Sequence, residues 1–223
     1  MAICRALSKT VAQPFVSQSV IEVRDVAYSL PDGRVLFSSL NATFGAERTG
    51  VVGANGTGKS TFLRLLAGEI QPTSGTITGA AALAYMPQSI DIAQNATVAA
   101  VLGLEPILLA CRRVEQGYPV DGDAETAEAD WNQLARATEG LAQLGLGRIR
   151  LDDAAAYLSG GERTRIAFLR IMLTNPRHLV LDEPTNHLDR DARLALRQIL
   201  DQWRGGVICV SHDRELLGRV DRI

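Results

Sequence analysis

The chain has 223 residues, 46% of them hydrophobic, so it is long enough to bury the core of one large domain or of a domain with a subdomain. Its formal net charge of −2 excludes a strong overall attraction to nucleic acid or to anionic membranes, so partners must be inferred from local sites. The three cysteines lie far apart in no metal-binding spacing, and no stretch approaches roughly 18 apolar residues. We therefore expect a cytoplasmic protein without a membrane-spanning helix.

The first part of the chain is expected to contain a leader followed by β-strands. Residues 1–18 have no continuous apolar segment, and we predict a loosely ordered leader that is not a signal peptide. In residues 19–44, apolar and β-branched runs at 20–23 and 26–30 flank a short break, a turn follows at 31–33, and an extended run resumes at 34–37. This pattern predicts an antiparallel β layer.

A glycine-rich loop comes next. Residues 53–60 read Gly-Ala-Asn-Gly-Thr-Gly-Lys-Ser and fit the pattern G-x-x-x-x-G-K-[ST], between a short apolar run at 47–52 and a helix-like pattern from Lys59. The glycines let backbone N–H groups face phosphate oxygens, Lys59 can place its charge against the β- and γ-phosphates, and Ser60 can offer its hydroxyl to Mg²⁺. An ordinary Gly-rich turn is the alternative, which the strand, loop and helix context disfavours. The residues predicted to bind a Mg-nucleotide are Gly53, Asn55, Gly56, Thr57, Gly58, Lys59, Ser60 and Thr61.

The middle of the chain changes character. After a turn at 71–75 and short strands at 76–78 and 82–86, helical patterns at 97–102, 105–114 and 124–144 predict a mostly helical subdomain over about residues 90–160. Ile107, Leu108, Cys111 and Val114 are expected to share one helix face. The ten acidic residues and five arginines of residues 105–158 argue against a large RNA-binding surface there.

A second glycine pair, in Leu-Ser-Gly-Gly-Glu at 158–162, precedes a helix expected to end near residue 173. Ser159 can cap this helix and Glu162, three positions on, can complete a capping box, which is the plain structural explanation. Capping does not account for Gly160 and Gly161, because each glycine lowers helix stability by roughly 1 kcal/mol where it is helical. Their bare backbone amides instead suit the close approach of a second anion.

Two adjacent carboxylates end an apolar strand at residues 179–183. Next to a phosphate-binding loop, Asp182 is placed to hold Mg²⁺ or its water, and Glu183 could polarise the water that attacks the γ-phosphate. A pair of surface acids is the alternative, which would be favoured without the glycine-rich loop. A helix at about 191–203 and a strand at 207–210 complete the α/β pattern.

These motifs, in this order, resemble the ATP-binding cassette (ABC) family over about residues 19–223. Residues 53–60 match the Walker A loop, 158–162 the ABC signature and 179–183 the Walker B strand. Gln88 resembles the glutamine that senses the γ-phosphate and Mg²⁺, Leu188-Asp189 the D-loop, and His212 the switch histidine. The resemblance implies an α/β fold of the P-loop NTPase type, in which an ABC-type core carries an N-terminal antiparallel β layer and an inserted α-helical subdomain. The roles it implies are catalysis for Glu183, His212 and Gln88, and metal binding for Ser60, Gln88 and Asp182.

The family also implies a composite site. Each ATP lies between the Walker A loop of one cassette and the signature of another, so Ser159, Gly160 and Gly161 would contact the nucleotide in trans. The implied partner is a second cassette, in the same chain or in a homodimer. We therefore expect the isolated chain to bind ATP with Mg²⁺ but to hydrolyse it slowly.

The finer assignment depends on residues 183–189, Glu-Pro-Thr-Asn-His-Leu-Asp, which look like the ABC-F group. That resemblance implies the ribosome as a partner and a role in translation or antibiotic resistance. Because the chain ends at Ile223 directly after the switch, we expect a fragment truncated at its C-terminus, the first of two cassettes. The position of the usual adenine-stacking aromatic falls at Leu30, with Tyr28 on the same face, and the sequence leaves open which of them stacks.

Two alternatives remain open. The ATP-binding subunit of a membrane transporter would use the same chemistry, although the Asn186-His187 pair weighs against it. A nucleotide-dependent clamp on DNA or RNA, or a binding module without turnover, is the other. Glu183 favours turnover, and the acidic insertion disfavours a strong grip on nucleic acid.

Overall fold

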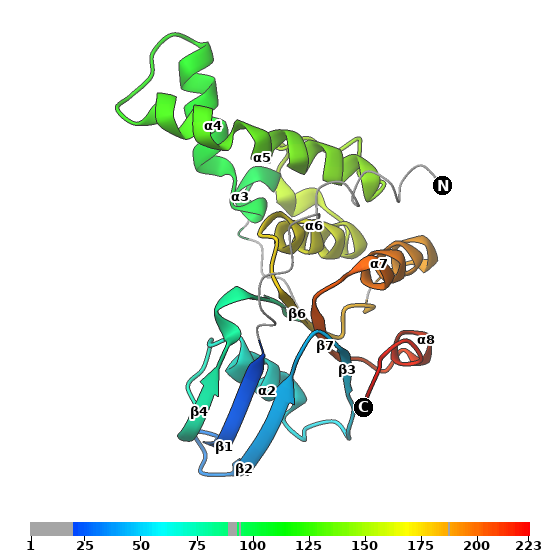
Figure 1. Cartoon of the computed structure of the whole chain (residues 1–223). Coiled ribbons are helices and arrows are strands. Elements are labelled where there is room, and N and C mark those ends of the chain that lie inside the picture. Colours follow the sequence, from blue (N-terminus) through cyan, green and yellow to red (C-terminus); the bar gives the residue numbers. More distant parts are fainter. Residues whose placement is uncertain (1–19, 89–92, 94, 187) are drawn as a thin grey trace. The chain divides into compact units, whose positions relative to one another are not determined.

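The computed structural model describes residues 20–88, 93, 95–186 and 188–223 (Figure 1). The predicted leader, residues 1–18, and His187 lie outside the described residues. The chain divides into two compact units. Within the described residues, the first unit holds 20–88, 175–186 and 196–223, and the second holds the residues between 93 and 174 together with 188–195.

The first unit contains an antiparallel sheet with strand order β2-β1-β4, formed by β1 (Ile21–Ser29), β2 (Val35–Phe44) and β4 (Ser74–Thr78). The break predicted inside the first strand is a β-bulge, because the register with β2 shifts between Val23 and Val26. Asp25 lies in the bulge with a φ of 48°, and its backbone N–H donates to the side chain of Asn41 at 2.9 Å. The two runs predicted on either side of the break thus belong to one continuous strand.

The second sheet of this unit is parallel, with order β3-β7-β6-β5. Its strands are β3 (Arg48–Val51), β5 (Leu83–Met86), β6 (His178–Asp182) and β7 (Gly206–Val210), and a short 3-10 turn, η1 (Ala80–Ala82), precedes β5. Every residue of β6 and β7 is buried, which explains why these strands read as unbroken apolar runs. The α/β fold class predicted from the sequence is confirmed.

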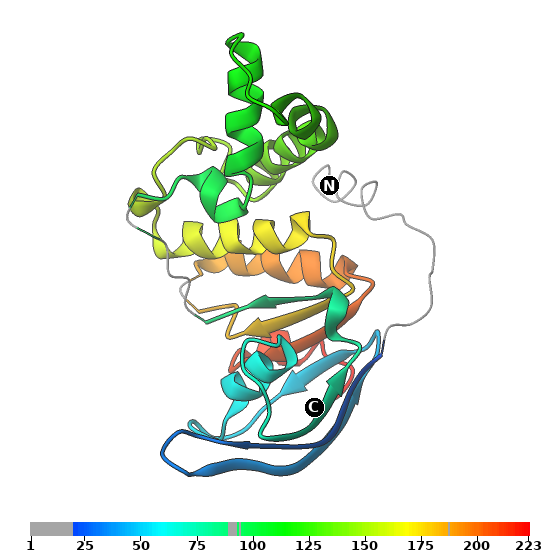
Figure 2. The same ribbon diagram turned by 90° about the vertical axis from the view of Figure 1, so that its left-hand side faces the viewer.

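Helix α2 (Lys59–Leu66) joins the two sheets into one core. Phe62, Leu63 and Leu66 of α2 pack in a single cluster with Ile21 of β1 and Ile208 of β7. Figure 2 shows α2, in cyan, lying between the antiparallel sheet and the parallel strands. The loop that precedes α2 is therefore fixed at both ends by buried elements.

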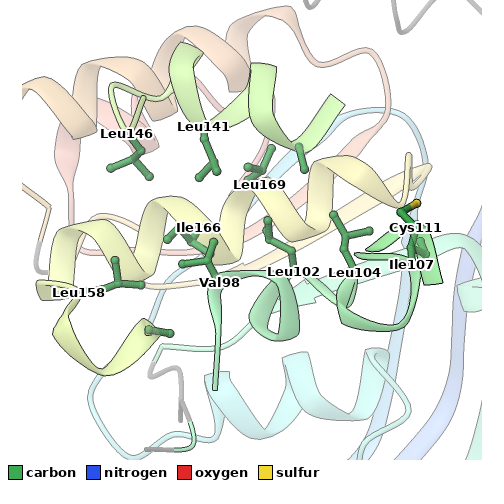
Figure 3. Packing of buried hydrophobic residues seen from close by; sticks show 12 residues of the cluster. Val98, Leu102, Leu104, Ile107, Cys111, Leu141, Leu146, Leu158, Ile166 and Leu169 are labelled. Carbon is green, nitrogen blue, oxygen red and sulfur yellow. The ribbon is translucent and has the colours of Figure 1, made fainter. Parts of the chain in front are cut away.

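The second unit is helical. It contains α3 (Val98–Leu102), α4 (Glu105–Glu115), α5 (Asp123–Gln143), the 3-10 turn η2 (Ala155–Tyr157) and α6 (Gly160–Leu173). Figure 3 shows the buried cluster that these elements share, in which Val98, Leu141 and Ile166 contribute from α3, α5 and α6. Of the four α4 residues expected to share one face, Ile107 and Cys111 are buried, Leu108 is half-buried and Val114 is exposed.

Two helices complete the description. Helix α7 (Arg190–Gln202) begins in the second unit and ends in the first, and α8 (Arg214–Leu217) follows β7. Across the described part of the chain, no helix combines the length and the apolarity needed to cross a membrane.

Candidate nucleotide-binding site

The glycine-rich loop lies between β3 and α2, as its sequence context predicts. Gly56 and Gly58 have φ values of 80° and 96°, a region that favours glycine. A Cβ on Gly58 would also stand 3.0 Å from the ring of Phe37. Gly58 caps α2 without a side-chain hydrogen bond, so the first amides of α2 stay available to an anion.

Two side chains of the loop hydrogen-bond the loop's own carbonyl oxygens. Lys59 Nζ donates to the carbonyl oxygens of Gly53 and Ala54 at 2.8 and 2.9 Å, and Thr57 Oγ1 donates to Ala54 O at 2.9 Å. Among the described residues the Lys59 ammonium group hydrogen-bonds carbonyl oxygens and forms no salt bridge, so it can turn to phosphate oxygens without breaking one. The loop thus presents one cation and several amides to the same small space.

Asp182 ends β6 and is 2% exposed. Burial raises the pKa of its carboxyl group, while the Ser60 hydroxyl, the Lys59 charge and the Tyr85 hydroxyl act to lower the pKa. One of its oxygens, Oδ1, is buried without a hydrogen-bond partner. A buried carboxylate oxygen left unsatisfied beside a serine hydroxyl fits Mg²⁺, which prefers oxygen ligands.

Metal ligation here would have to rely on few protein groups. Among the residues that the structure describes, no cluster of three or more His, Cys, Asp or Glu could hold a metal ion. Mg²⁺ commonly takes one or two protein ligands and completes its shell with phosphate oxygens and water. The pair of Ser60 and Asp182 therefore suits Mg²⁺ delivered with a nucleotide better than a dedicated metal centre.

Glu183 follows Asp182 in an unusual backbone conformation, with a φ of 48°. Its backbone N–H donates to Val210 O at 2.8 Å, and its carboxylate accepts from the backbone N–H of His212 at 3.3 Å. His212 Nε2 lies 3.4 Å from the other carboxylate oxygen. The side chain of Glu183 is 10% exposed and that of His212 is 65% exposed, so the carboxylate is fixed and the imidazole faces outward.

The predicted signature lies in the second unit and forms the capping box expected from its sequence. Ser159 accepts from the backbone N–H of Glu162, and the Glu162 carboxylate accepts from Ser159 N and from Ser159 Oγ, both at 2.8 Å. Arg148 donates to the second oxygen of the same carboxylate. These bonds lower the pKa of Glu162 to about 2, mainly through the backbone N–H and then the hydroxyl of Ser159.

The structure thus brings part of the predicted site together. In the first unit, Asp182 adjoins Ser60 and Lys59, and Glu183 contacts His212. Gln88 is exposed two residues after β5, and the signature residues belong to the other unit.

Sequence reasoning missed three residues that support these groups, namely Tyr85 beside Asp182, Arg148 on Glu162, and Arg197 on Asp213. The alternation along β5 could have placed Tyr85 on one face of the sheet. No sequence pattern near Arg148 or Arg197 indicated that either arginine would pair with these carboxylates.

The chain is similar in sequence to known proteins. The family model described as ABC transporter matches residues 39–186. The tylosin resistance ATP-binding protein TlrC of Streptomyces fradiae is 35% identical over 85% of this chain and 39% of its own length. ABC transporter F family member 3 of Arabidopsis thaliana is 36% identical over 92% of this chain and 26% of its own.

A third curated relative and a solved structure are also similar to this chain. The energy-dependent translational throttle protein EttA of Escherichia coli (strain K12) is 31% identical over 92% of this chain and 40% of its own. This chain therefore spans less than half the length of each of these curated relatives. A solved structure, "Structure of ATP binding subunit of ABC transporter", superposes with a TM-score of 0.68 at 22% identity, over 90% of this chain and 82% of that one, which shows a shared fold.

Proposed function

The chain belongs to the ABC transporter family as a nucleotide-binding cassette domain, and on this premise we propose that it binds ATP with Mg²⁺ and hydrolyses it to ADP and phosphate. The observation that carries the proposal is the contrast between the two adjacent carboxylates at the end of β6. Asp182 is buried with an unsatisfied oxygen beside Ser60, and Glu183 is held against His212. One is suited to a cation and the other to a water molecule.

The roles proposed for Ser60, Asp182, Glu183 and His212 are supported by these positions, and that of Gln88 by the family resemblance. The loop amides and Lys59 bind the β- and γ-phosphates, and Ser60, Asp182 and Gln88 would hold Mg²⁺, which supplies charge neutralisation for the phosphates when it is bound. Glu183 accepts a hydrogen bond from the attacking water and increases its nucleophilicity, while His212 restrains the Glu183 carboxylate and is available to donate to a phosphate oxygen. The bond between the β–γ bridging oxygen and the γ-phosphorus breaks, and the water oxygen becomes part of the released phosphate.

We further propose that a second cassette completes the site. The amides of Gly160 and Gly161, at the start of α6, and the Ser159 hydroxyl would contact the γ-phosphate of the ATP held by the partner. In this structure Ser159 Oγ donates to Glu162, so contact with a phosphate oxygen requires the hydroxyl to redirect its hydrogen. The second cassette would come from the same polypeptide or from another copy.

At the cellular level we propose an ABC-F-like role in the cytoplasm, on the ribosome, in translation or in resistance to an antibiotic. Support comes from the Asn186-His187 pair in the sequence and from relatives named for tylosin resistance and for translational throttling.

The central test measures binding and turnover separately. Isothermal titration of the chain with MgATP should show binding that Lys59→Ala weakens strongly, since the loop loses its only side-chain cation. Glu183→Gln should retain binding, lose turnover, and form a dimer with ATP but not with ADP in analytical ultracentrifugation. Unchanged turnover in Glu183→Gln would remove Glu183 from its role, and MgATP binding unaffected by Lys59→Ala would remove the loop from its own.

Binding to the ribosome is tested in a separate sedimentation experiment. Glu183→Gln with ATP should sediment with purified ribosomes, whereas Lys59→Ala combined with Glu183→Gln, the matched control, should not. Equal sedimentation of both variants, or of neither, would contradict nucleotide-dependent ribosome binding while leaving the ATPase proposal standing.

A further inference from the structure

The last residue of β7 and the three residues that follow it are each held by hydrogen bonds. Val210 O accepts from Glu183 N at 2.8 Å, and the buried Ser211 accepts from the Asp213 backbone N–H at 3.0 Å. His212 contacts the Glu183 carboxylate through both its backbone N–H and its ring, at 3.3 and 3.4 Å. These last two contacts are long for hydrogen bonds, so the position of the imidazole depends on the backbone on either side of it.

Asp213 provides the anchor on the C-terminal side. Its Oδ1 accepts from the backbone N–H groups of Glu215 and Leu216 and so caps α8, while Oδ2 accepts from Arg197 of α7 at 3.1 Å. Burial alone would raise the pKa of Asp213, yet the guanidinium and the two backbone donors bring it below its ordinary value. Both oxygens of this carboxylate are therefore committed.

Arg197 is held through both terminal nitrogens of its guanidinium group. The side chains of Arg197 and Asp213 are 14% and 12% exposed, and the other arm of the guanidinium donates to Glu215, which is 72% exposed. A nearly buried charge pair resists separation, because parting it would leave an uncompensated charge in a poorly solvated place. The exposed contact with Glu215 contributes little by comparison.

We propose that Arg197 is a positioning residue for ATP hydrolysis, which holds Asp213 and thereby keeps the His212 imidazole against the Glu183 carboxylate. The inference rests on the proposed function, since it takes the roles of Glu183 and His212 from there. It adds a residue on α7, 16 positions away from the loop, to the groups that set the geometry of the reaction. Arg197 itself touches no reacting atom.

The expected effects separate positioning from plain stabilisation. Arg197→Lys keeps a positive charge but loses the planar, two-armed contact. Asp213→Asn keeps an oxygen that can cap α8 but loses the ionic contact with Arg197. Glu215→Gln is the matched control, because it removes the exposed carboxylate charge that also pairs with the Arg197 guanidinium. It leaves Asp213 unchanged.

The first measurement needs no turnover. Hydrogen–deuterium exchange of the full chain, followed by mass spectrometry, should show faster exchange over residues 211–217 in Arg197→Lys and in Asp213→Asn, and unchanged exchange there in Glu215→Gln. Unaltered exchange in the first two variants would overturn the proposal. So would an equal increase in the control.

The second measurement is a double-mutant cycle on steady-state ATP hydrolysis. Arg197→Lys should lower kcat by about tenfold with little change in KM, as expected when a catalytic group is misplaced. In a His212→Ala background the same substitution should cost nothing further, because the residue it positions is gone. An equal loss of kcat in both backgrounds would show a purely structural role and overturn the proposal. Absence of turnover in the parent chain would contradict the proposed function instead, and the exchange experiment would still decide the role of Arg197.

Discussion

Removal of the charge on Glu162 should destabilise the chain in a way that depends on pH. Glu162 is 6% exposed and accepts hydrogen bonds from Ser159 and Arg148, which lower its pKa from 4.5 to about 2. A shift of that size corresponds to about 3 kcal/mol if none of it is screened. Because the Arg148 side chain is 78% exposed, solvent screens its share, and we expect about 1–2 kcal/mol for Glu162→Gln at pH 7.

The pH dependence follows from the direction of the shift. The folded chain favours the ionised carboxylate, so this stabilisation is complete above the unfolded pKa near 4.5 and is lost as the pH falls through about 2. Glutamine can still act in the capping box, which leaves the charge as the main difference between the two proteins. Urea unfolding followed by circular dichroism should show a gap between wild type and Glu162→Gln that is largest at pH 7 and nearly closed at pH 2.

The control is Glu115→Gln, which removes an exposed carboxylate on α4 and should change the free energy of unfolding by less than about 0.5 kcal/mol. A gap for Glu162→Gln that is equally large at pH 7 and at pH 2 would refute the electrostatic reasoning. So would a loss of the same size in the control.

Three further predictions concern other parts of the chain. Gly58→Ala should weaken MgATP binding in calorimetry more than Gly56→Ala, because both positions have positive φ but only a Cβ on Gly58 would meet the Phe37 ring; equal losses would assign the effect to backbone strain alone. Leu141→Ala should lower the unfolding free energy of the helical unit by about 2–5 kcal/mol through loss of buried contacts, and MgATP affinity unchanged within error would show that the glycine-rich loop folds independently of that cluster. The thiol of Cys209, whose pKa burial raises, should resist iodoacetamide at pH 8 in the native chain and react in urea; rapid native labelling seen by mass spectrometry would contradict its burial in β7.

The sequence predicted those helices and strands that have a clear local pattern of apolar residues or glycines. The strand expected at 47–52 is β3 (Arg48–Val51), and the helix expected from Lys59 starts there. The apolar strand expected at residues 179–183 is β6 (His178–Asp182), which includes the first of the two carboxylates. In each case consecutive residues carry the signal, either as an unbroken buried run or as a change from glycine to helical spacing. The catalytic assignments to Glu183, His212 and Gln88 stay predictions.

Long-range contacts could not be predicted in the same way. Arg148 and Glu162 are 14 positions apart, and Arg197 and Asp213 are 16 apart. Arginine and acidic residues are frequent enough on helices that no spacing singles out these pairs. The bulge at Asp25 is similar, since its partner Asn41 comes from the neighbouring strand, and only the paired sheet shows that the polar residues belong inside it.

The backbone conformation of Glu183 lowers the stability of the fold at a residue with a proposed catalytic role. A left-handed conformation costs a non-glycine residue on the order of 1 kcal/mol, and the hydrogen bond from Glu183 N to Val210 O holds it there. A glycine at this position would remove the conformational cost of the positive φ, but it would also remove the carboxylate. Directed evolution that selects for thermal stability alone would therefore favour Glu183→Gly. Stabilised variants of this protein should be screened for ATP turnover at every round.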